Sequence, residues 1–392
     1  MITVEEAQAR ILALARPLPA EMVPLARAAG RWLAAPVVAA RDQPPFAASA
    51  MDGYAVAGRV TAGARFRVVG TAAAGGRWRG RLQPGEALRI FTGAPVPEGA
   101  EAVLIQEDAE PHGETVTVRA GHDTARHIRA AGQDIPRGWT MTPRRLRPAD
   151  LALLAAMNVA EVPAIRRPVV AVISTGDELV SPGEVPRDDQ ITASNGIALR
   201  AMAEAEGAEV RLLPIARDSL AELTAVLRLA EGADLIVTTG GASVGDHDLV
   251  ARVAADLGMA PAFHRVSMRP GKPLMAGNLM GAAMIGLPGN PVSAMVCGQV
   301  FMLPLIRALQ GDPAPLPRPR RATLAADTGP TGPRTHYMRA GLTSGDGLPR
   351  IEALARQDSS LLSVLAEAEA LLIRPMGDGP RRAGETVTYL PL

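Results

Sequence analysis

The chain has 392 residues, which is too long for one hydrophobic core, so we expect roughly two to four domains. Its 47% hydrophobic and 21% charged residues are typical of a globular protein, and a formal net charge of +1 with scattered basic residues gives no indication of nucleic-acid binding. The single cysteine excludes an intrachain disulfide, and the six histidines show no metal-ligand spacing.

Two stretches of the sequence bear on its location. The N-terminal sequence MITVEEAQARILALARPL has two acids where a secretory signal peptide would carry basic residues. The most apolar long stretch, residues 292–306, is shorter than a membrane span and contains Ser, Gln and Pro. We therefore expect a cytoplasmic protein that binds neither membrane nor nucleic acid.

The first part of the chain changes from helical to β character and back. Residues 1–40 are expected to be helical, because apolar residues recur at helical spacing over 4–16. Over residues 41–140, short alternating runs such as RFRVVG and TVTVRAG are separated by Gly and Pro, which predicts a compact β domain. A helical pattern returns at 147–157, opened by Pro148, so the β segment is expected to be inserted into a helical domain.

From Pro168 the pattern alternates between strands and helices. PVVAVIST, AEVRLLPI and DLIVTTGG are expected strands. Ser194 is the candidate N-cap of the first intervening helix, and Ser219 opens the second. Continuous apolar strands alternating with amphipathic helices predict a parallel sheet covered on both faces. The Pro-rich segment 312–321 is the expected linker to a small C-terminal β domain.

The loops after the expected strands are the candidate ligand site, because ligands bind beyond the carboxyl ends of open parallel sheets. These loops read STGDEL (174–179), RDS (217–219) and TTGGASVGDHD (238–248). Glycines in the last loop would let backbone N–H groups approach an anion closely. The glycine spacing matches neither a Rossmann nor a P-loop signature.

Acidic residues are unusually frequent in these loops. Five carboxylates would repel a bare phosphate, so we expect Mg²⁺ to accompany an anionic ligand. The alternative is that some of them, Asp218 and Asp246 in particular, cap the following helices. The acids are Asp177, Glu178, Asp218, Asp246 and Asp248.

Two further loops offer groups for an anion. GLPGNPVSA (286–294) is an expected strand-to-helix turn, and RPGKP (269–273) supplies two cations. Among 41 basic residues Lys272 is the single lysine, which leaves forty arginines. An ammonium is a compact charge with three rotatable donors, suited to a small oxyanion, so we interpret Lys272 as functional rather than as a chance survivor on the surface.

Together these motifs resemble the molybdopterin molybdenumtransferase family, the MoeA-like proteins related to the E domain of gephyrin. The resemblance covers the whole chain in family order. It is carried by PPFAASAMDGYAV (44–56), IFTGAPVPEGAEAV (90–103), STGDEL, TTGGASVGD, RPGKP and GLPGNPVSA.

The resemblance implies a multidomain fold that combines α/β and β domains. An elongated helical domain would comprise residues 1–43 and 141–167, with an inserted β domain at 44–140. A parallel-sheet α/β molybdopterin-binding domain would follow at 168–311, and a C-terminal β-barrel-like domain at 312–392.

The implied reaction is insertion of molybdate into adenylylated molybdopterin, which releases AMP and molybdenum cofactor and requires Mg²⁺. The resemblance also implies a homodimer, with the site between the α/β domain of one subunit and the inserted β domain of the other. Molybdopterin adenylyltransferase and molybdoenzymes that accept the cofactor are the expected partners.

The resemblance, added to the strand-end loops, implies a set of functional residues. The residues expected to take part in catalysis are Asp52, Thr92, Glu178, Asp218, Asp248 and Lys272. The residues expected to bind substrate are Arg129, Asp134, Gly240, Gly241, Ser243, Gly245, Arg269, Pro288, Gly289, Asn290 and Pro291. The expected metal ligands are Asp52, Glu178, Asp218, Asp246 and Asp248.

Some of these positions allow another interpretation or depart from the family pattern. Asp52 precedes a glycine, and Asp-Gly is also a common hairpin-turn pair. Ala47 and Ala48 stand where relatives often have polar residues, and Arg269 stands where relatives commonly have lysine. Neither departure removes a proposed catalytic group.

Two other functions remain open from the sequence. A molybdopterin adenylyltransferase would resemble residues 168–310 only, whereas this resemblance extends through the inserted domain. A non-catalytic scaffold or pterin-binding protein, like the gephyrin E domain when it anchors receptors, would not need the complete set of acids. The acids therefore favour an enzyme.

Overall fold

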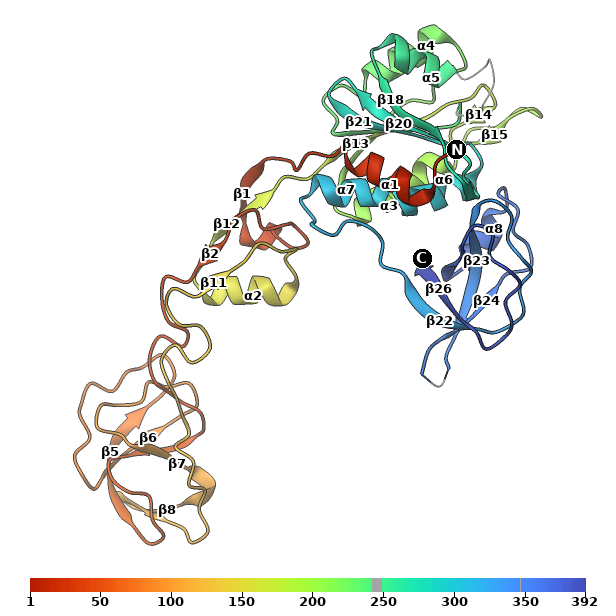
Figure 1. The fold of residues 1–392 in the computed structure, drawn as a ribbon. Helices are drawn as coiled ribbons and strands as arrows, with labels where there is room; N and C mark the ends of the chain where they lie inside the picture. The colour runs from red at the N-terminus through yellow and green to blue at the C-terminus, as the bar shows by residue number, and fades with distance from the viewer. Residues whose placement is uncertain (242–248, 346) are drawn as a thin grey trace. The chain divides into compact units, whose positions relative to one another are not determined.

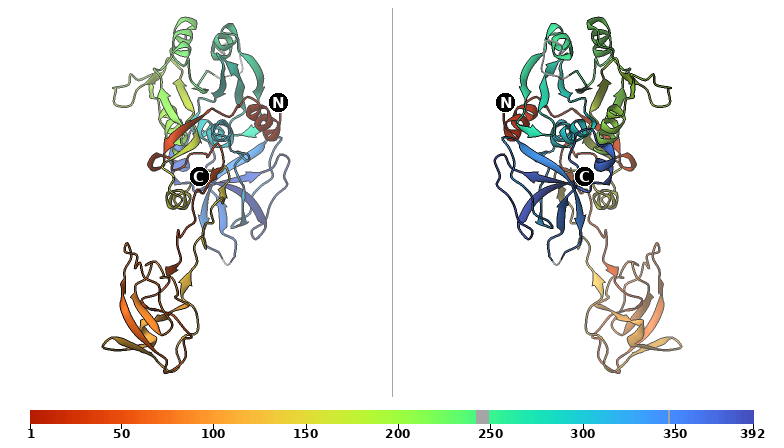
Figure 2. Two further views of the ribbon diagram at one scale, coloured as in Figure 1. Left: turned by 90° about the vertical axis from the view of Figure 1, so that its left-hand side faces the viewer. Right: turned by 90° about the vertical axis from the view of Figure 1, so that its right-hand side faces the viewer.

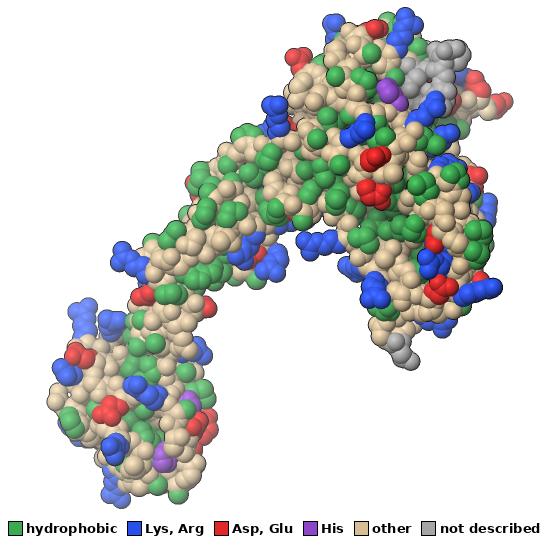
Figure 3. Space-filling view, in the orientation of Figure 1, with side chains coloured by type: hydrophobic (Ala, Val, Ile, Leu, Met, Phe, Trp, Pro, Cys, Tyr) green, Lys and Arg blue, Asp and Glu red, His purple; other side chains and the backbone are tan. Residues whose placement is uncertain are grey.

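A computed structural model describes residues 1–241, 249–345 and 347–392 of the chain. These residues form two compact units (Figure 1). The first unit comprises Met1–Glu21, Gly30–Ala34 and Ala164–Leu392, and the second comprises Met22–Ala29 and Ala35–Pro163. Basic and acidic side chains are interspersed on the visible face of each unit (Figure 3).

A six-stranded sheet is the centre of the first unit, with strand order β16-β13-β17-β21-β20-β18. Four neighbouring strands are parallel, as the sequence predicts: β16 (Glu209–Leu212), β13 (Val169–Ser174), β17 (Leu235–Thr239) and β21 (Ala282–Leu287). Two antiparallel strands extend the sheet beyond β21: β20 (Pro273–Leu279) and β18 (Ala260–Arg265). The sheet is therefore mixed, and its parallel part is the predicted one.

Helices cover both faces of this sheet. On one face lie α1 (Val4–Leu12), α3 (Asn195–Ala205), α6 (Pro291–Cys297) and α7 (Leu303–Leu309). On the other face lie α4 (Leu220–Arg228) and α5 (Leu249–Asp256). The apolar run of β13 serves both faces, because Val170 and Val172 join the first core whereas Ala171 and Ile173 join the second.

The helical run Pro291–Leu309 is the one helix of the described chain that is long and apolar enough to cross a membrane, by length and composition alone. It is 19 residues long because a π-helical segment, Gly298–Met302, joins α6 to α7. Its mean hydropathy is 1.7. The expectation that this stretch is too short to span a membrane is therefore wrong on length. It is instead 78% buried inside the protein, where it packs in the core of the α/β domain.

The N-terminal segment has less helix than the sequence predicts. Only Val4–Leu12 is an α-helix; it begins with a Thr3–Glu6 capping box, and Pro17 and Pro19, which lack the backbone donor, follow it. The remainder contains β1 (Ala20–Pro24), a 3₁₀ turn (Leu25–Arg27) and β2 (Val37–Val38). Helix α1 lies beside α7 within its unit (Figures 1 and 2).

The second unit contains the predicted β domain. Its sheet has the order β7-β4-β6-β5-β9-β8 and encloses two small apolar clusters. Its strands are β4 (Gly53–Val56), β5 (Arg65–Ala72), β6 (Glu86–Ile90), β7 (Ala102–Ile105), β8 (Ala109–His112) and β9 (Thr115–Val118). Short pairs join β3 (Ala48–Ser49) to β10 (Ile128–Arg129) and β2 to β11 (Thr140–Met141), and helix α2 (Pro148–Ala156) opens at the predicted proline.

The C-terminal domain is a closed five-stranded barrel, which confirms the predicted barrel-like fold. The ring runs β23-β24-β22-β26-β25, and β25 pairs again with β23 to close it. Its strands are β22 (Arg320–Leu324), β23 (Thr335–Thr343), β24 (Arg350–Ala353), β25 (Ala370–Arg374) and β26 (Thr386–Pro391). A short strand of the α/β domain, β19 (Met268–Arg269), adds to β23 in parallel. The exact boundaries of the four predicted domains stay a prediction.

Candidate functional site

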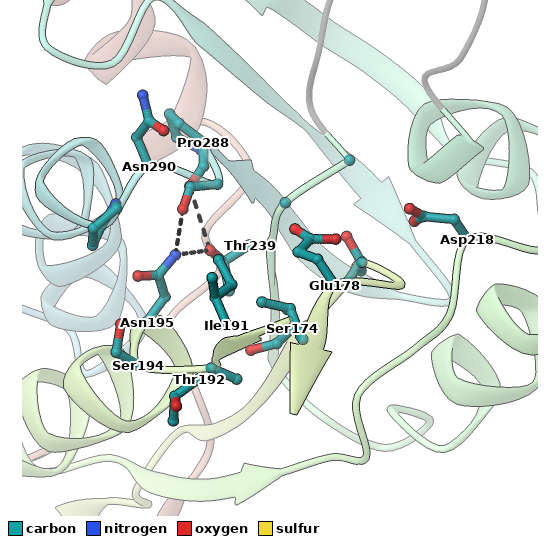
Figure 4. A pocket seen from close by; sticks show the side chains of 18 of the residues that line it. Ser174, Glu178, Ile191, Thr192, Ser194, Asn195, Asp218, Thr239, Pro288 and Asn290 are labelled. Carbon is teal, nitrogen blue, oxygen red and sulfur yellow. Dashed lines mark hydrogen bonds between the residues drawn. The ribbon is translucent and has the colours of Figure 1, made fainter. Parts of the chain in front are cut away.

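A pocket of about 930 Å³ opens at the carboxyl ends of β13, β17 and β21, where the sequence places the ligand site (Figure 4). All of its lining residues belong to the first unit. The predicted site residues that line it are Glu178, Asp218, Gly240, Gly241, Pro288, Gly289, Asn290 and Pro291. Four further predicted residues, Ser243, Gly245, Asp246 and Asp248, lie outside the described part of the chain.

The STGDEL turn after β13 holds Glu178 at the pocket. Gly176 has φ +145°, and a Cβ at that position would collide with the Glu178 carboxylate, which folds back over the glycine. The positive φ is the reason that glycine is favoured at this position. The Gly176 N–H donates to the Ala216 carbonyl oxygen (3.0 Å), so the turn is joined to the segment that leads to Asp218.

Asp218 is not a helix cap, contrary to the alternative interpretation. The N-cap of α4 is Ser219, whose Oγ accepts from the Glu222 N–H (3.2 Å), as the sequence predicts for that serine. The Asp218 side chain is exposed and lines the pocket. Its own N–H donates to Oδ1 of Asp177 (3.0 Å).

Glu178 and Asp218 both line the pocket, and we call these two residues the acid pair. The Asp218 carboxylate points towards Glu178 (Figure 4), and neither acid forms an ion pair with any residue of 1–241, 249–345 or 347–392. Of the five predicted metal ligands, the structure brings these two together, whereas Asp52 belongs to the other unit. Within the described residues no group of three His, Cys, Asp or Glu side chains could hold a metal ion.

The glycines after β17 are required by close packing. A Cβ on Gly240 (φ +96°) would collide with the Thr175 carbonyl oxygen, and one on Gly241 would collide with Val250. Because the chain must pass tightly between β13 and α5, this pocket wall is made of backbone rather than side chains.

Asn195, a residue not predicted from the sequence, links the strand ends around the pocket. Its Nδ2 donates to Thr239 Oγ1 (2.9 Å) and to the Gly289 carbonyl oxygen (2.7 Å), as Figure 4 shows. The Thr239 hydroxyl in turn donates to the Pro288 carbonyl oxygen (3.3 Å). The side chain of Asn195, at the start of α3, thereby fixes the GLPGN loop; the asparagine after the predicted N-cap was the available signal.

The RPGKP loop reaches the pocket through Pro273 rather than through its cations. Lys272 and Arg269 are exposed and do not line the pocket. Gly271 is buried against Cys297, whose Sγ lies 3.9 Å from the Gly271 carbonyl oxygen. Burial raises the pKa of the Cys297 thiol. Cys297 therefore supports the loop from below and is not a reactive group.

A buried arginine of the C-terminal domain lies next to this loop and was also missed. Arg339 on β23 is 0% exposed, and its Nη2 donates to the Asp358 carbonyl oxygen (3.0 Å), whereas its Nε and Nη1 have no hydrogen-bond partner among the described residues. Burial lowers the pKa of Arg339, the nearby charge of Asp358 partly opposes this shift, and Arg269 lowers the pKa further. Nothing in the sequence THYMRAGLT marks this arginine as buried.

Arg269 and Arg339 belong to one cationic region beside the pocket. The β19–β23 pairing places Arg269 opposite His336, whose pKa is lowered to about 4 by burial and then by the charges of Arg269 and Arg339. The region adjoins the pocket through Ser360, which lines it and whose N–H and Oγ donate to Asp358 Oδ1 (2.8 and 2.6 Å). An anion bound here would accept from the Nε and Nη1 donors of Arg339, which have no partner among the described residues.

In the second unit, Asp52 is held firmly by Thr92. The Thr92 N–H and hydroxyl both donate to Asp52 Oδ1 at 2.7 Å. These two hydrogen bonds, the backbone one first, lower the pKa of Asp52, and Arg89 lowers it further. Asp52 precedes β4, and its neighbour β3 pairs with β10, so the hairpin-turn interpretation of Asp-Gly is wrong.

Arg129 and Asp134 lie in the same unit and are exposed. Arg129 is paired with Ala48 across the β3–β10 ladder, and the Asp134 N–H donates to the Gln43 carbonyl oxygen (3.1 Å). Their role as substrate-binding residues stays a prediction.

The comparisons with known proteins agree with this architecture. Models of the MoeA N-terminal region (domain I and II), the probable molybdopterin binding domain and the MoeA C-terminal region (domain IV) match residues 2–158, 171–308 and 321–392. Molybdopterin molybdenumtransferase 2 of Mycobacterium tuberculosis is 38% identical over 392 residues, with 96% of each chain covered. The molybdopterin molybdenumtransferase of Haemophilus influenzae is 33% identical, with 100% of this chain and 98% of the relative covered.

A solved structure is similar along the whole chain. The molybdopterin biosynthesis MoeA protein of Pyrococcus horikoshii has a TM-score of 0.83 and 28% identity, and it covers 100% of this chain and 99% of its own. The three family models, the full-length relatives and this fold lead to one conclusion: the chain belongs to the molybdopterin molybdenumtransferase (MoeA) family and is an enzyme of molybdenum cofactor biosynthesis.

Proposed function

We propose that this enzyme inserts molybdate into adenylylated molybdopterin and releases AMP and molybdenum cofactor. One observation carries the proposal: a single pocket is lined by two carboxylates that form no ion pair among the described residues, and it adjoins, through Ser360, a buried arginine with two donor nitrogens that have no described hydrogen-bond partner. Such a pocket suits an anionic substrate that arrives with a cation, together with a second, small oxyanion.

Mg²⁺ fits the acid pair. Glu178 and Asp218 offer carboxylate oxygens, the ligands that Mg²⁺ prefers, and both are exposed at the pocket without a described counter-ion. When bound there, the ion would supply positive charge that reduces the repulsion between the acids and an anionic substrate. The backbone N–H groups of the glycine-rich strand ends would face the remaining phosphate oxygens.

The cationic region would hold the molybdate. Arg339 provides two buried donors without a partner in the described chain, and Arg269 and Lys272 lie on the neighbouring RPGKP loop. Reaction of molybdate at the phosphoanhydride mainly requires that the reactants be positioned and their charge neutralised. Fixed cations and a fixed carboxylate meet these requirements.

The enzyme would work as a cytoplasmic homodimer. Asp52 and Thr92 would then come from the second subunit, with Asp52 already fixed in its ionised form. A molybdopterin adenylyltransferase would supply the substrate, and molybdoenzymes would accept the product. The resemblance to the family supports these proposals.

The first test measures AMP release from purified adenylylated molybdopterin with Mg²⁺, with and without micromolar molybdate. Molybdate-dependent release by the wild type that is lost in Asp52→Ala would support both the reaction and the role of the inserted domain. Tight binding without molybdate-dependent release would contradict the proposal and leave a pterin-binding protein or scaffold.

A further inference from the structure

Arg217 makes an unusual set of contacts beneath the acid pair. It lies between β16 and Asp218, and its Nη1, which carries two N–H groups, is within hydrogen-bond distance of three backbone carbonyl oxygens of the STGDEL turn, those of Gly176 (3.4 Å), Asp177 (3.0 Å) and Leu179 (2.8 Å). One nitrogen of Arg217 therefore contacts backbone carbonyl oxygens on both sides of Glu178.

The same two segments are joined by a second, reciprocal contact. The Asp177 carboxylate accepts from the Asp218 N–H (3.0 Å). A side chain of the STGDEL turn therefore contacts the backbone at Asp218, just as the Arg217 side chain contacts the backbone of the turn. The Glu178 carbonyl oxygen is held separately, by the Ile191 N–H (2.7 Å). The backbone at both acids is therefore fixed, whereas their carboxylates carry no described partner.

This arrangement has a physical reason. Three carbonyl oxygens that converge on one point repel each other unless a donor satisfies them, and the guanidinium supplies positive charge as well as hydrogen bonds. Without Arg217 the turn would relax, and repulsion between Glu178 and Asp218 would favour a wider separation of the two carboxylates.

We propose that Arg217 is a positioning residue that fixes Glu178 and Asp218 at the spacing required for binding a divalent cation. This inference rests on the proposed function of the pocket. Arg217 acts through the backbone of the turn and need not touch the cation or the substrate. Partners that orient metal ligands in this way typically change metal affinity about 10- to 100-fold when removed.

Three variants of the 392-residue chain test the proposal. Arg217→Met keeps the apolar stem and removes the donors. Arg217→Lys keeps a charge with three donors, and because a single nitrogen makes all three contacts, an ammonium can replace much of its effect. Arg211→Met is the matched control, because Arg211 also donates through Nη1 to a backbone carbonyl, that of Glu231 (3.1 Å), and does not line the pocket.

The first readout is Mn²⁺ binding without substrate, followed by electron paramagnetic resonance of the free ion, with thermal unfolding as the check that each variant folds. We expect Arg217→Met to bind Mn²⁺ about tenfold or more weakly, and Arg217→Lys to stay within about threefold of the wild type. Arg211→Met should bind Mn²⁺ like the wild type. Equal Mn²⁺ affinity in Arg217→Met and Arg211→Met would overturn the proposal.

The second readout is the Mg²⁺ dependence of AMP release. We expect Arg217→Met to need more Mg²⁺ for half-maximal rate and to recover its kcat at saturating Mg²⁺, whereas a loss of kcat that Mg²⁺ does not restore would contradict a positioning role. If the wild type shows no molybdate-dependent release, the proposed function fails, and Mn²⁺ binding still decides the role of Arg217. The positioning role of Arg217 would also be overturned if the wild type bound Mn²⁺ no more tightly than a Glu178→Gln, Asp218→Asn double variant.

Discussion

Asp52 of the inserted domain and the two acids of the pocket, Glu178 and Asp218, are held in place by different parts of the residue. Asp52 has its side chain fixed, because Thr92 donates two hydrogen bonds to one carboxylate oxygen. Glu178 and Asp218 have their backbone fixed, by Arg217 and Asp177, and leave their carboxylates free. A satisfied carboxylate keeps its position and charge through a reaction, whereas a free one can exchange water for a ligand.

The largest effect should come from removing the free carboxylates. In a Glu178→Gln, Asp218→Asn double variant the side chains keep their size and lose both charges, so we expect molybdate-dependent AMP release at millimolar Mg²⁺ to fall roughly 100-fold. Asp177→Asn is the control: it removes a charge from the same turn but retains an oxygen that can accept from the Asp218 N–H. Similar losses in the two proteins would break the distinction between free and satisfied acids.

A smaller loss is expected for Lys272→Arg, which extends the comparison to the cations. The guanidinium is planar and larger than the compact ammonium, so we expect turnover to fall about tenfold or more and the fold to be unchanged. Turnover and the KM for molybdate measure the loss of activity, and circular dichroism checks that the fold is unchanged. Arg269→Lys in the same loop should change turnover by less than about threefold, because an ammonium fits an oxyanion there as well. Full turnover in Lys272→Arg would remove the argument from lysine usage.

Thr92→Val tests the fixed carboxylate and should have a modest effect at neutral pH. The variant keeps the Thr92 N–H and loses the hydroxyl, so the lowered pKa of Asp52 should rise part of the way towards its usual value. Asp52 stays ionised at pH 7 in both proteins. Carbon-13 NMR titration of Asp52 measures the shift, and Thr92→Ser, which keeps a hydroxyl, should leave the pKa near that of the wild type.

The pH dependence of stability should change in the same variant. Because the pKa of Asp52 is lower in the folded protein, its ionised form stabilises the fold above the unfolded pKa, and this contribution is lost as the pH falls through the lowered folded value. Thr92→Val should therefore lose part of this contribution, and its acid unfolding should begin at higher pH. Identical acid-unfolding curves for Thr92→Val and the wild type would contradict the conclusion that the Thr92 hydroxyl stabilises ionised Asp52.

The smallest effect on catalysis is expected for Ser219→Ala. It removes the N-cap of α4 and should reduce the free energy of unfolding by about 1 kcal/mol, measured by urea denaturation. Turnover should not change, because Asp218, one residue earlier, does not depend on the serine hydroxyl. A loss of turnover comparable to that of the pocket variants would mean that the cap and the acid act as one unit.

Local signals in the sequence predicted the parts of the fold that local chemistry determines. The apolar runs of β13 and β17 indicated a sheet covered on both sides, Ser219 marked a helix start, and Pro148 marked another. The loops after those strands did line the pocket. Where the sequence failed, tertiary structure decided: α1 stops at Leu12 within a longer helical pattern, and β18 and β20 pair antiparallel without a distinctive sequence.

The missed site residues have a common physical cause. Arg217 acts on backbone carbonyls and Arg339 is buried by a barrel strand, and neither backbone acceptors nor burial of a single arginine leaves a mark among forty arginines. Asn195 likewise acts on a carbonyl and a hydroxyl that meet only after the sheet has formed. The acids were predictable because their charge is visible in the sequence, whereas the groups that position them are not.

The burial of the chain's single thiol has a practical consequence. Cys297 is 0% exposed beneath the RPGKP loop, so reagents that attack exposed thiolates cannot reach it in the folded enzyme. The natural chain is therefore a ready background for site-directed spectroscopy, in which any cysteine introduced on the surface becomes the sole point of attachment for a probe. Pairs of such probes, one on the inserted domain and one beside the pocket, can follow distances during turnover without removal of the native residue.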